Sequence, residues 1–569
     1  MARLLHQKSV ALSRSVARRL AGISNPVLTP SQDAARYTEL YLPAPPTDDQ
    51  VYRFFDTAFW RFVWILVTQL AILFGFIMVM RHNVYTTVFG LLCLAFMIPH
   101  IVDSAYLRLR RRSISLDAHL ALKQEFAETA EHDSSVDVFL PVCGEEIAVL
   151  QNTFHYVRRL DWPGRLTVYV LDDADSAEVR KLADYYGFEY VVRENRGWMK
   201  KAGNLINAFD HSTGEFIAVF DADFAPRPDF LWETLPYMED RKIGVVQTSQ
   251  FFNVDKRYNF ISRSAGALQE FFFRWVQCQR QLDDAAIVAG TNLVYRRAAV
   301  DAAGGFAQTP IGEDVHSGIK LWWAGYKTRY VPLALATGLA PESFNALANQ
   351  QYRWCRSSML LMINTHFRDA VLTRKQRLCF WAAFLFYMTS ALIPITASTT
   401  GLLMIWLYPT KVHLINYLPL VPGAISTCLI FRTLAKGWWL GIYRVCMINS
   451  FCHMLACVHA LRGHVEPWAP TGDKTIKANT PRTVARMFRI WFVIVQALIW
   501  TGVVRDLQTH PIIPFLPVIS LACLQLYLLF PSVMKLPYNH AFDRRIVWPH
   551  HPDRGLFMRP DDLVVLADA

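Results

Sequence analysis

Six long apolar segments constrain what this chain of 569 residues can fold into. Each is close to the length of about 20 apolar residues that a helix needs to cross a bilayer. Two precede a polar region and four follow it, at 59–80, 84–102, 379–408, 412–434, 487–504 and 512–530. We expect Pro394 to break the third into two pieces, because proline lacks the amide hydrogen that an inner helical position donates. The pattern predicts a multi-pass α-helical membrane protein with a soluble insert, both termini lying on the side of the insert.

Basic residues indicate which side of the membrane the insert occupies. The net charge is +11, and arginines follow the second apolar segment at once, at 108 and 110–112. In membrane proteins such residues accumulate in the cytoplasm, so the charge is weak evidence for nucleic acid and we predict none as a partner. We therefore expect the protein in the cell membrane (inner or plasma), with the insert cytoplasmic. The apolar stretch 438–461 carries Arg444, Asn449, His453 and His459, which favours an interfacial helix.

The changes in composition divide the chain into five predicted parts. Residues 1–57 form a basic cytosolic segment, which is an interfacial helix, a disordered segment or a transit peptide. The other parts are a transmembrane hairpin (58–104), a cytosolic α/β domain (135–357), interfacial helices with a transmembrane channel (358–534) and a cytosolic tail (535–569).

Short β-rich runs alternate with helix-like stretches in the cytosolic part. The runs lie at 136–140, 166–171, 190–192, 216–220 and 244–247. Alternation of strand and helix is typical of a mostly parallel sheet with helices on its faces. We therefore predict a Rossmann-like α/β domain between the two sets of membrane helices.

Carboxylates follow two of these runs directly. Asp172 and Asp173 end one strand, and Asp221 and Asp223 end another. The carboxyl ends of neighbouring parallel strands share one edge, where open α/β sheets bind ligands. A divalent cation on a nucleotide diphosphate needs one or two carboxylates, and Lys201 can balance the diphosphate charge. These features indicate transfer from a nucleotide-activated donor, and do not distinguish sugar from phosphoryl transfer. Taken alone, such aspartates can also be solvated corners or helix caps.

Five short motifs and their order resemble the processive family 2 glycosyltransferases, which include cellulose, chitin and hyaluronan synthases. The motifs are DDADS (172–176), KAGN (201–204), DADF (221–224), GED (312–314) and QQYRW (350–354). LAPES (339–343) and VQTSQFF (246–252) look most like bacterial cellulose synthase-like proteins. The resemblance implies a GT-A fold that uses UDP-glucose with Mg²⁺ or Mn²⁺ and exports its polymer through its own membrane channel.

The resemblance also implies roles for residues at the donor end of the site. Asp172 and Asp173 match the motif that holds the uridine and ribose, and Lys201 matches the lysine near the donor. Asp221 and Asp223 match the metal-binding motif.

Further residues match the family's general base and its QxxRW motif. Asp314 matches the general base, beside Glu313, which we expect to be structural. Gln350, Arg353 and Trp354 match QxxRW, in which the arginine meets the diphosphate and the tryptophan stacks under the acceptor sugar. An indole face suits the C–H face of a pyranose. Ordinary packing is the alternative for Trp354.

The chain departs from the family at two places. The first strand ends in PVCGEE, where Gly144 replaces an asparagine, so only Glu145 is carried over as a substrate-binding residue. VAGTN (288–292) stands where cellulose synthases often have FFCG, which leaves the linkage open.

The loop 464–480 resembles a gating loop over the donor, with Thr471 and Lys474 as its candidate contacts.

These features predict a processive, inverting β-glucan synthase, with 1,4-linkage favoured. The alternatives are a curdlan-type 1,3-linked or mixed-linkage glucan, a chitin-like polymer from UDP-N-acetylglucosamine, or a non-catalytic channel or scaffold subunit. The expected partners are UDP-glucose, the growing polysaccharide and membrane lipid, with an accessory export subunit or a second copy of the chain as open possibilities.

Overall fold

The structure of the protein is a computed structural model. It describes residues 37–55, 59–80, 84, 86–88, 90–91, 93–95, 115–129, 132–369, 372–418, 420–433, 441–464, 479–535 and 543–549. The chain divides into two compact units, Met1–Leu42 with Asn539–His550, and Pro43–Tyr538 with His551–Ala569. In the first unit, β1 (Tyr37–Tyr41) pairs in parallel with β11 (Asp543–Val547).

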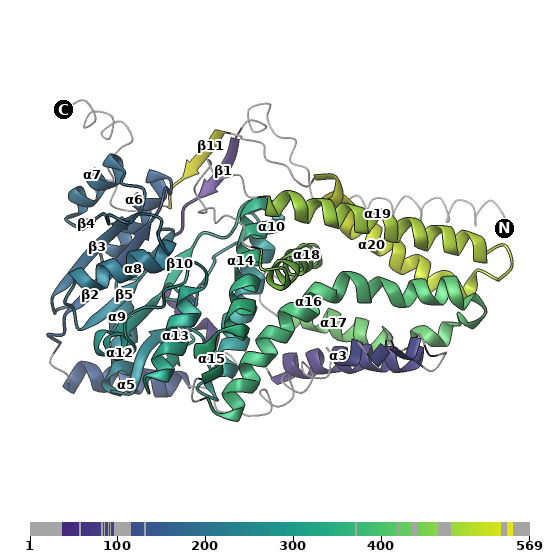
Figure 1. Ribbon diagram of the computed structural model, residues 1–569, viewed down its shortest axis with the longest axis horizontal. Helices are drawn as coiled ribbons and strands as arrows, with labels where there is room; N and C mark the ends of the chain where they lie inside the picture. The colour runs from purple at the N-terminus through teal and green to yellow at the C-terminus, as the bar shows by residue number, and fades with distance from the viewer. Residues whose placement is uncertain are drawn as a thin grey trace, which may run out of the picture. The chain divides into compact units, whose positions relative to one another are not determined.

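A seven-stranded sheet forms the centre of the α/β domain in the larger unit (Figure 1). Its strand order is β4–β3–β2–β5–β8–β7–β9. The strands are β2 (Val136–Val142), β3 (Leu166–Asp172), β4 (Glu189–Val191), β5 (Phe216–Val219), β7 (Ile243–Gln247), β8 (Leu293–Arg296) and β9 (Lys327–Tyr330). Strands β4, β3, β2 and β5 are parallel, as predicted, whereas β8 runs antiparallel to both of its neighbours.

The central strands are buried on both faces. Val138 and Leu140 of β2 belong to one hydrophobic core, whereas Phe139 between them belongs to another. This follows from the alternation of side chains along a strand. Helices cover both faces: α6 (Ile147–Val157), α7 (Ala177–Tyr186), α8 (Lys200–His211), α9 (Phe230–Thr234), α12 (Arg297–Ala302) and α13 (Glu313–Trp323). A parallel sheet needs this cover, which explains its continuous apolar runs. Helix α10 (Phe260–Phe271) instead contributes Ile261 and Ala265 to the core shared with the apolar helices.

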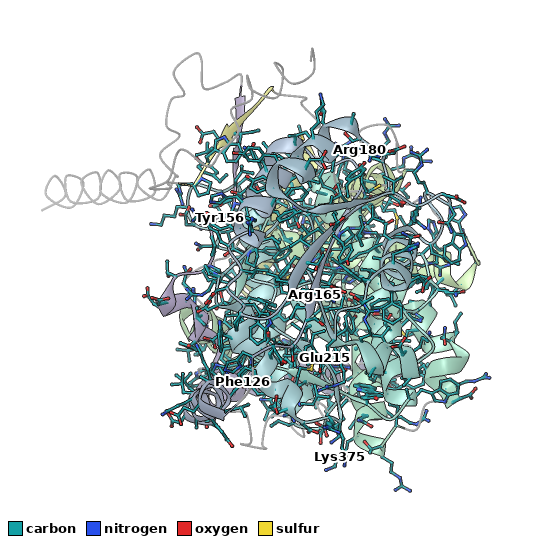
Figure 2. The ribbon with its side chains drawn as sticks, turned by 90° about the vertical axis from the view of Figure 1, so that its left-hand side faces the viewer. Phe126, Tyr156, Arg165, Arg180, Glu215 and Lys375 are labelled. Carbon is teal, nitrogen blue, oxygen red and sulfur yellow. The ribbon has the colours of Figure 1, made fainter. Side chains whose placement is uncertain are left out.

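The two edges of the sheet differ in character. Arg165 and Glu215, labelled in Figure 2, immediately precede β3 and β5, and both are exposed. They mark the amino edge of the parallel strands. The carboxyl edge instead carries the acidic motifs, and the long helix α14 (Phe344–Ile363) follows the sheet in the chain.

Helix α14 connects the α/β domain to the apolar helices. It packs against α18 (Ile442–Leu461) and α16 (Arg374–Leu407), as Figure 1 shows. The remaining apolar helices are α3 (Phe59–Met80), α17 (Leu420–Thr433), α19 (Thr480–Asp506) and α20 (Leu516–Lys535). Helix α17 packs on α3, where Ser426 donates a hydrogen bond to the carbonyl of Trp64.

Four helices of the described part are long and apolar enough to cross a membrane, namely Arg374–Leu407, Ile442–Leu461, Thr480–Asp506 and Ile513–Met534. The sequence predicted six crossings. Three of the predicted segments, 379–408, 487–504 and 512–530, coincide with candidate spans. Of the remaining three, 84–102 lies largely outside the described residues. The described residues of 412–434 give one short 3₁₀ turn, Leu414–Tyr417, and then α17, which has 14 residues. The apolar part of α3 is Val63–Gly75.

Helix α18 covers most of the stretch 438–461, for which the sequence favoured an interfacial helix. By length and composition it is one of the four candidate spans. Two of the polar residues that the prediction named, Asn449 and His453, are buried, and His453 Nδ1 lies 2.8 Å from Ser390 Oγ of α16. Polar side chains in membrane helices commonly bind across helix contacts in this way.

Helix α16 continues through Pro394, so the predicted break is wrong. Trp491 Nε1 donates to the carbonyl of Pro394 at 2.8 Å, and Thr396 Oγ1 donates to the carbonyl of Leu392 at 3.1 Å. Side chains thus supply hydrogen bonds around the proline, as membrane helices require.

Candidate active site

Asp172 shapes the turn that leaves β3. It is fully buried, and its carboxylate accepts hydrogen bonds from the amides of Ala174 and Ser176, at 2.9 and 2.8 Å. The hydroxyl of Tyr190 adds a third bond at 2.8 Å. Bonds from a side chain to the amides two and four residues on are typical of aspartate at a turn. Asp172 is therefore a rigid part of the carboxyl edge, and its predicted contact with the nucleoside stays a prediction.

Asp173 forms a buried ion pair that the sequence reasoning missed. Arg193 Nε and Nη2 donate to its two carboxylate oxygens at 2.7 and 2.8 Å. Arg193 Nη2 also donates to the carbonyl of Lys200 at 3.2 Å, and Nη1 donates to the carbonyl of Trp198 at 2.6 Å. Arg193 lies just beyond β4, at the same edge as the acidic motifs, which is the signal that could have identified it.

The loop held by Arg193 enters α8 in a strained conformation. Met199 and Lys200 have φ of 50° and 53°, which non-glycine residues rarely adopt. The next residue, Lys201, forms an ion pair with Asp221 and donates to the carbonyl of Gly290 at 2.8 Å. Burial pulls the pKa of Lys201 down, but the neighbouring carboxylates outweigh it and the net shift is upward. Lys201 is thus a cation fixed beside the DADF motif.

The DADF motif follows β5, whose residues are fully or nearly fully buried. Burial raises the pKa of Asp223 to about 8, and the charges of Asp221 and Glu145 add to this effect. Burial also raises the pKa of Glu145. The hydrogen bond that its carboxylate accepts from the amide of Cys143 at 2.6 Å lowers this pKa, but by less. The carboxyl groups of Glu145, Asp221 and Asp223 thus lie close together, and Lys201 is a neighbouring cation.

These carboxyl groups fit a divalent cation that also binds the phosphate oxygens of a nucleotide. Among the described residues no group of three or more His, Cys, Asp or Glu side chains is arranged to hold a metal by itself. Mg²⁺ in nucleotide sites uses one or two carboxylates, and phosphate oxygens and water complete its shell. Asp221 and Asp223 supply those carboxylates. Mutual repulsion of close carboxylates is relieved by a cation.

Asp314 lies in the first turn of α13. Burial raises its pKa to about 7, and the charge of Glu313 adds to this, while Lys201 opposes it. Its Oδ1 accepts a bond from the amide of Val315 at 2.8 Å. A Cβ placed on Gly290 would lie 3.0 Å from Asp314 Oδ2, so the carboxylate packs directly on this glycine. A carboxyl group that titrates near neutral pH suits a general base.

Helix α14 presents the QQYRW motif beside α13. A Cβ on Gly312 would collide with the hydroxyl of Ser357, so the start of α13 packs tightly on α14. Burial lowers the pKa of Arg353, and the charges of Glu313 and Asp221 oppose that shift. Arg353 therefore belongs to the same electrostatic cluster as the acidic motifs.

Gln350 and Trp354 are half-buried and four residues apart on α14. This spacing places them on one face of the helix, next to Arg353 in the chain. The structure thus positions them beside the cluster, and their roles toward substrate stay predictions. Thr471 and Lys474, and nearly all of the predicted gating loop 464–480, lie outside the described residues.

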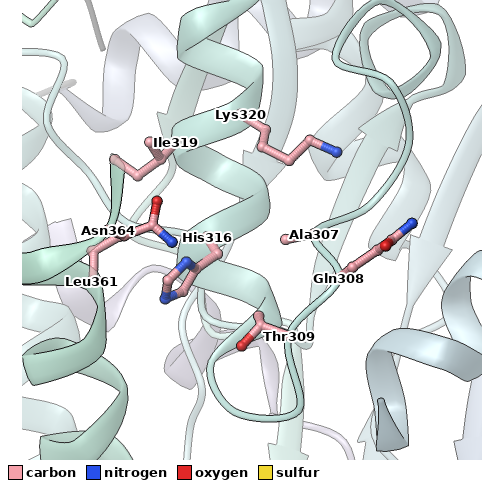
Figure 3. Close-up of a pocket in the computed structure, with 8 residues that line it drawn as sticks. All are labelled: Ala307, Gln308, Thr309, His316, Ile319, Lys320, Leu361 and Asn364. Atoms are coloured by element: carbon pink, nitrogen blue, oxygen red, sulfur yellow. The ribbon is translucent and has the colours of Figure 1, made fainter. Parts of the chain in front are cut away.

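A separate cavity borders the other part of α13 (Figure 3). It has a volume of about 260 Å³ and contains none of the predicted site residues. Its lining comprises Ala307, Gln308, Thr309, His316, Ile319, Lys320, Leu361 and Asn364. Lys320 Nζ donates to the carbonyl of Gly305 at 2.7 Å. The cavity is therefore distinct from the acidic cluster.

Comparison with known proteins places this geometry in context. The family model described as "Glycosyltransferase like family 2" matches residues 136–357. A cellulose synthase catalytic subunit [UDP-forming] of Pseudomonas fluorescens is 34% identical over 272 residues, which are 46% of this chain and 36% of that protein. Cellulose synthase 1 of Komagataeibacter xylinus is 33% identical over 267 residues, which are 46% of this chain and 17% of that protein. The chain thus matches less than two fifths of the length of these relatives.

Among solved structures, a mannosyltransferase from Pyrobaculum calidifontis in complex with GDP-Man and Mn²⁺ aligns with a TM-score of 0.43 and 17% identity. The alignment covers 64% of this chain and 99% of that one.

Proposed function

Because residues 136–357 match the family model "Glycosyltransferase like family 2", we propose that this chain transfers glucose from UDP-glucose to a growing β-glucan, with 1,4-linkage favoured. The observation that carries the proposal is one electrostatic cluster built from distant motifs. Its members are Glu145, Lys201, Asp221, Asp223, Glu313, Asp314 and Arg353. The names of the relatives, cellulose synthases that include UDP-forming subunits, support the choice of donor.

The reaction is a single displacement with inversion. Asp314 accepts the proton of the acceptor hydroxyl, whose oxygen forms a bond to the anomeric carbon of glucose. The bond from that carbon to the UDP oxygen breaks on the opposite face, and UDP leaves. Lys201 and Arg353 offset the negative charge that builds up on the diphosphate. The buried position of Asp314 keeps its carboxyl group in the titration range that a base needs.

Asp221 and Asp223 would hold the divalent cation, Mg²⁺ or Mn²⁺. Such an ion supplies positive charge to the diphosphate oxygens and orients the donor. Asp172 and Asp173 hold the nucleoside end in this proposal. Asp173 does so while paired with Arg193, which also bonds the carbonyls of Trp198 and Lys200 in the loop before α8.

The membrane helices supply the path for the product. Helix α14 runs from the site to the helices α16 and α18 against which it packs, and in the proposal these line the export channel. The α/β domain then lies on the cytoplasmic face of the cell membrane. An accessory export subunit or a second copy would bind outside this core.

A direct test supplies the purified chain, in detergent or lipid discs, with radiolabelled UDP-glucose or UDP-N-acetylglucosamine. Insoluble product that is digested by a β-1,4-specific glucanase supports the proposal. Product digested only by a β-1,3-glucanase selects a curdlan-type enzyme, an alternative that the divergent segment VAGTN (288–292) leaves open. Absence of UDP release with either donor contradicts an enzymatic function.

A further inference from the structure

A buried glutamine clamps the segment that lies between the catalytic motifs. Gln247 ends β7 and its exposed fraction is 0%. Its Oε1 accepts a hydrogen bond from the amide of Ala289 at 2.7 Å, and its Nε2 donates to the carbonyl of Thr291 at 2.8 Å. One carboxamide therefore holds the backbone on both sides of Gly290.

The clamped segment touches three different motifs. The carbonyl of Gly290 accepts from Lys201 Nζ at 2.8 Å, and the hydroxyl of Thr291 accepts from the amide of Asp221 at 2.8 Å. Asp314 packs on the Cα side of Gly290. A shift of this backbone would therefore move the lysine, the DADF motif and the base relative to one another.

A second layer of polar side chains supports the clamp. Gln250 Nε2 donates to the carbonyl of Ala289 at 2.7 Å, and Gln269 Nε2 donates to Gln250 Oε1 at 2.7 Å. Thr248 Oγ1 donates to the carbonyl of Asn292 at 2.8 Å. The segment is thus fixed by a buried network, in which each bond depends on its neighbours.

We propose that Gln247 is a positioning residue for glucosyl transfer. It contacts none of the reacting groups; it fixes Gly290, and through it the separation of Lys201, Asp221 and Asp314. The inference rests on the proposed function. Displacements of about 1 Å in a catalytic site can cost about 10²-fold in rate. Donor binding should change less, because Asp172 and Asp173 are held by contacts of their own at the end of β3.

Gln277 offers a matched control on the same stretch of chain. It also has an exposed fraction of 0%, and its carboxamide also clamps backbone: Nε2 donates to the carbonyl of Ile287 at 2.7 Å and Oε1 accepts from its amide at 3.1 Å. Ile287 lies three positions before Gly290. Loss of this clamp removes equivalent bonds without releasing the segment at Gly290.

The experiment compares full-length Gln247→Met and Gln277→Met for UDP release and thermal unfolding. We expect kcat to fall at least about tenfold in Gln247→Met, while KM for UDP-glucose stays within about threefold of the wild-type value. The loss of thermal stability should equal that of Gln277→Met. Gln277→Met should keep kcat within about twofold. If Gln247→Met does not fold, Gln247→Glu, which keeps the acceptor for Ala289 and loses the donor for Thr291, is judged by the same criteria.

Two outcomes overturn the inference: a kcat close to that of the wild type in the Gln247 variant, or equal losses of kcat in the Gln247 and Gln277 variants. Failure of the proposed function is distinguishable, because the wild type itself would then release no UDP from UDP-glucose.

Discussion

Arg193 and Asp173 form a two-pronged ion pair, with Nε to Oδ1 at 2.7 Å and Nη2 to Oδ2 at 2.8 Å. The two side chains are only 1% and 5% exposed. The arginine is also bonded to the carbonyls of Trp198 and Lys200, so the pair ties the end of β3 to the loop that delivers Lys201. One contact therefore stabilises the fold and orders the site.

Removing one partner of this pair should be strongly destabilising. We expect Arg193→Met to cost about 3–5 kcal/mol, because it leaves a buried carboxylate without compensation. Arg196→Met is the control, since Arg196 pairs with Asp175 at 2.8 Å with both side chains more than 40% exposed, and exposed pairs contribute about 0–1 kcal/mol. Thermal unfolding of the two variants measures both losses of stability. Equal losses in the two variants would contradict a structural role for the buried pair.

Asp314→Asn should abolish transfer while UDP still binds. The amide is nearly isosteric with the carboxyl group but cannot accept the proton, and general-base catalysis typically contributes about 10²–10⁴-fold. UDP release in the presence of acceptor, together with UDP titration, separates the two effects. Glu313→Gln serves as the neighbouring control and should lose less. Turnover near that of the wild type in Asp314→Asn would remove this residue from the base role.

The pH dependence of kcat/KM should report the Asp314 carboxyl group. Its pKa is raised to about 7, so the fraction of the basic form falls as pH decreases through that value. We expect kcat/KM to fall about tenfold for each unit below about pH 6 and to level off above about pH 8. Initial rates of UDP release from about pH 5 to about pH 9 provide the measurement. A profile that stays flat down to pH 5 would be inconsistent with this assignment.

Gly290→Ala should impair catalysis through Asp314. Gly290 has φ of 81°, and a Cβ there would press on the aspartate. We expect at least about a tenfold loss of kcat, because the base is displaced. Gly325→Ala is matched in backbone strain, with φ of 87°, but its Cβ would have no atom within 4 Å. If both variants lose activity equally, strain rather than displacement of the base is the cause.

Removal of divalent cations should stop transfer. In the proposed site, Asp221 and Asp223 would hold such an ion together with donor phosphates, so EDTA should reduce UDP release to background, and excess Mg²⁺ or Mn²⁺ should restore it. Asp223→Asn should raise the cation concentration needed for half-maximal rate. Full activity in EDTA would show that Lys201 and Arg353 suffice for charge balance.

The acidic motifs could be predicted because strand ends carry a clear signal. Apolar runs that stop at Asp172 and Asp221 mark the same edge of a parallel sheet, and the structure confirms that those two strands flank β2 with their carboxyl ends together. The direction of β8 could not be predicted, because a strand of four residues has no periodicity of its own and its orientation depends on the loop before it.

Contacts over long sequence separations account for the other differences. The ion pair of Asp173 depends on a loop with positive φ values, for which Met199 and Lys200 give no sequence signal. The continuity of α16 at Pro394 depends on Trp491, which is 97 residues away. The burial of His453 in α18 likewise depends on Ser390 of another helix. Local patterns contain no information about such partners.

Helix α14 is unbroken from Phe344 to Ile363, with Arg353 near its midpoint and Met359 and Leu361 in the core shared with α16 and α18. A rod of this kind transmits displacement along its whole length. Under the proposed function, movement of the polymer among the apolar helices would act on Arg353, which we propose to lie beside the diphosphate. Under that function, this one helix would couple the release of UDP to the advance of the polymer by one sugar.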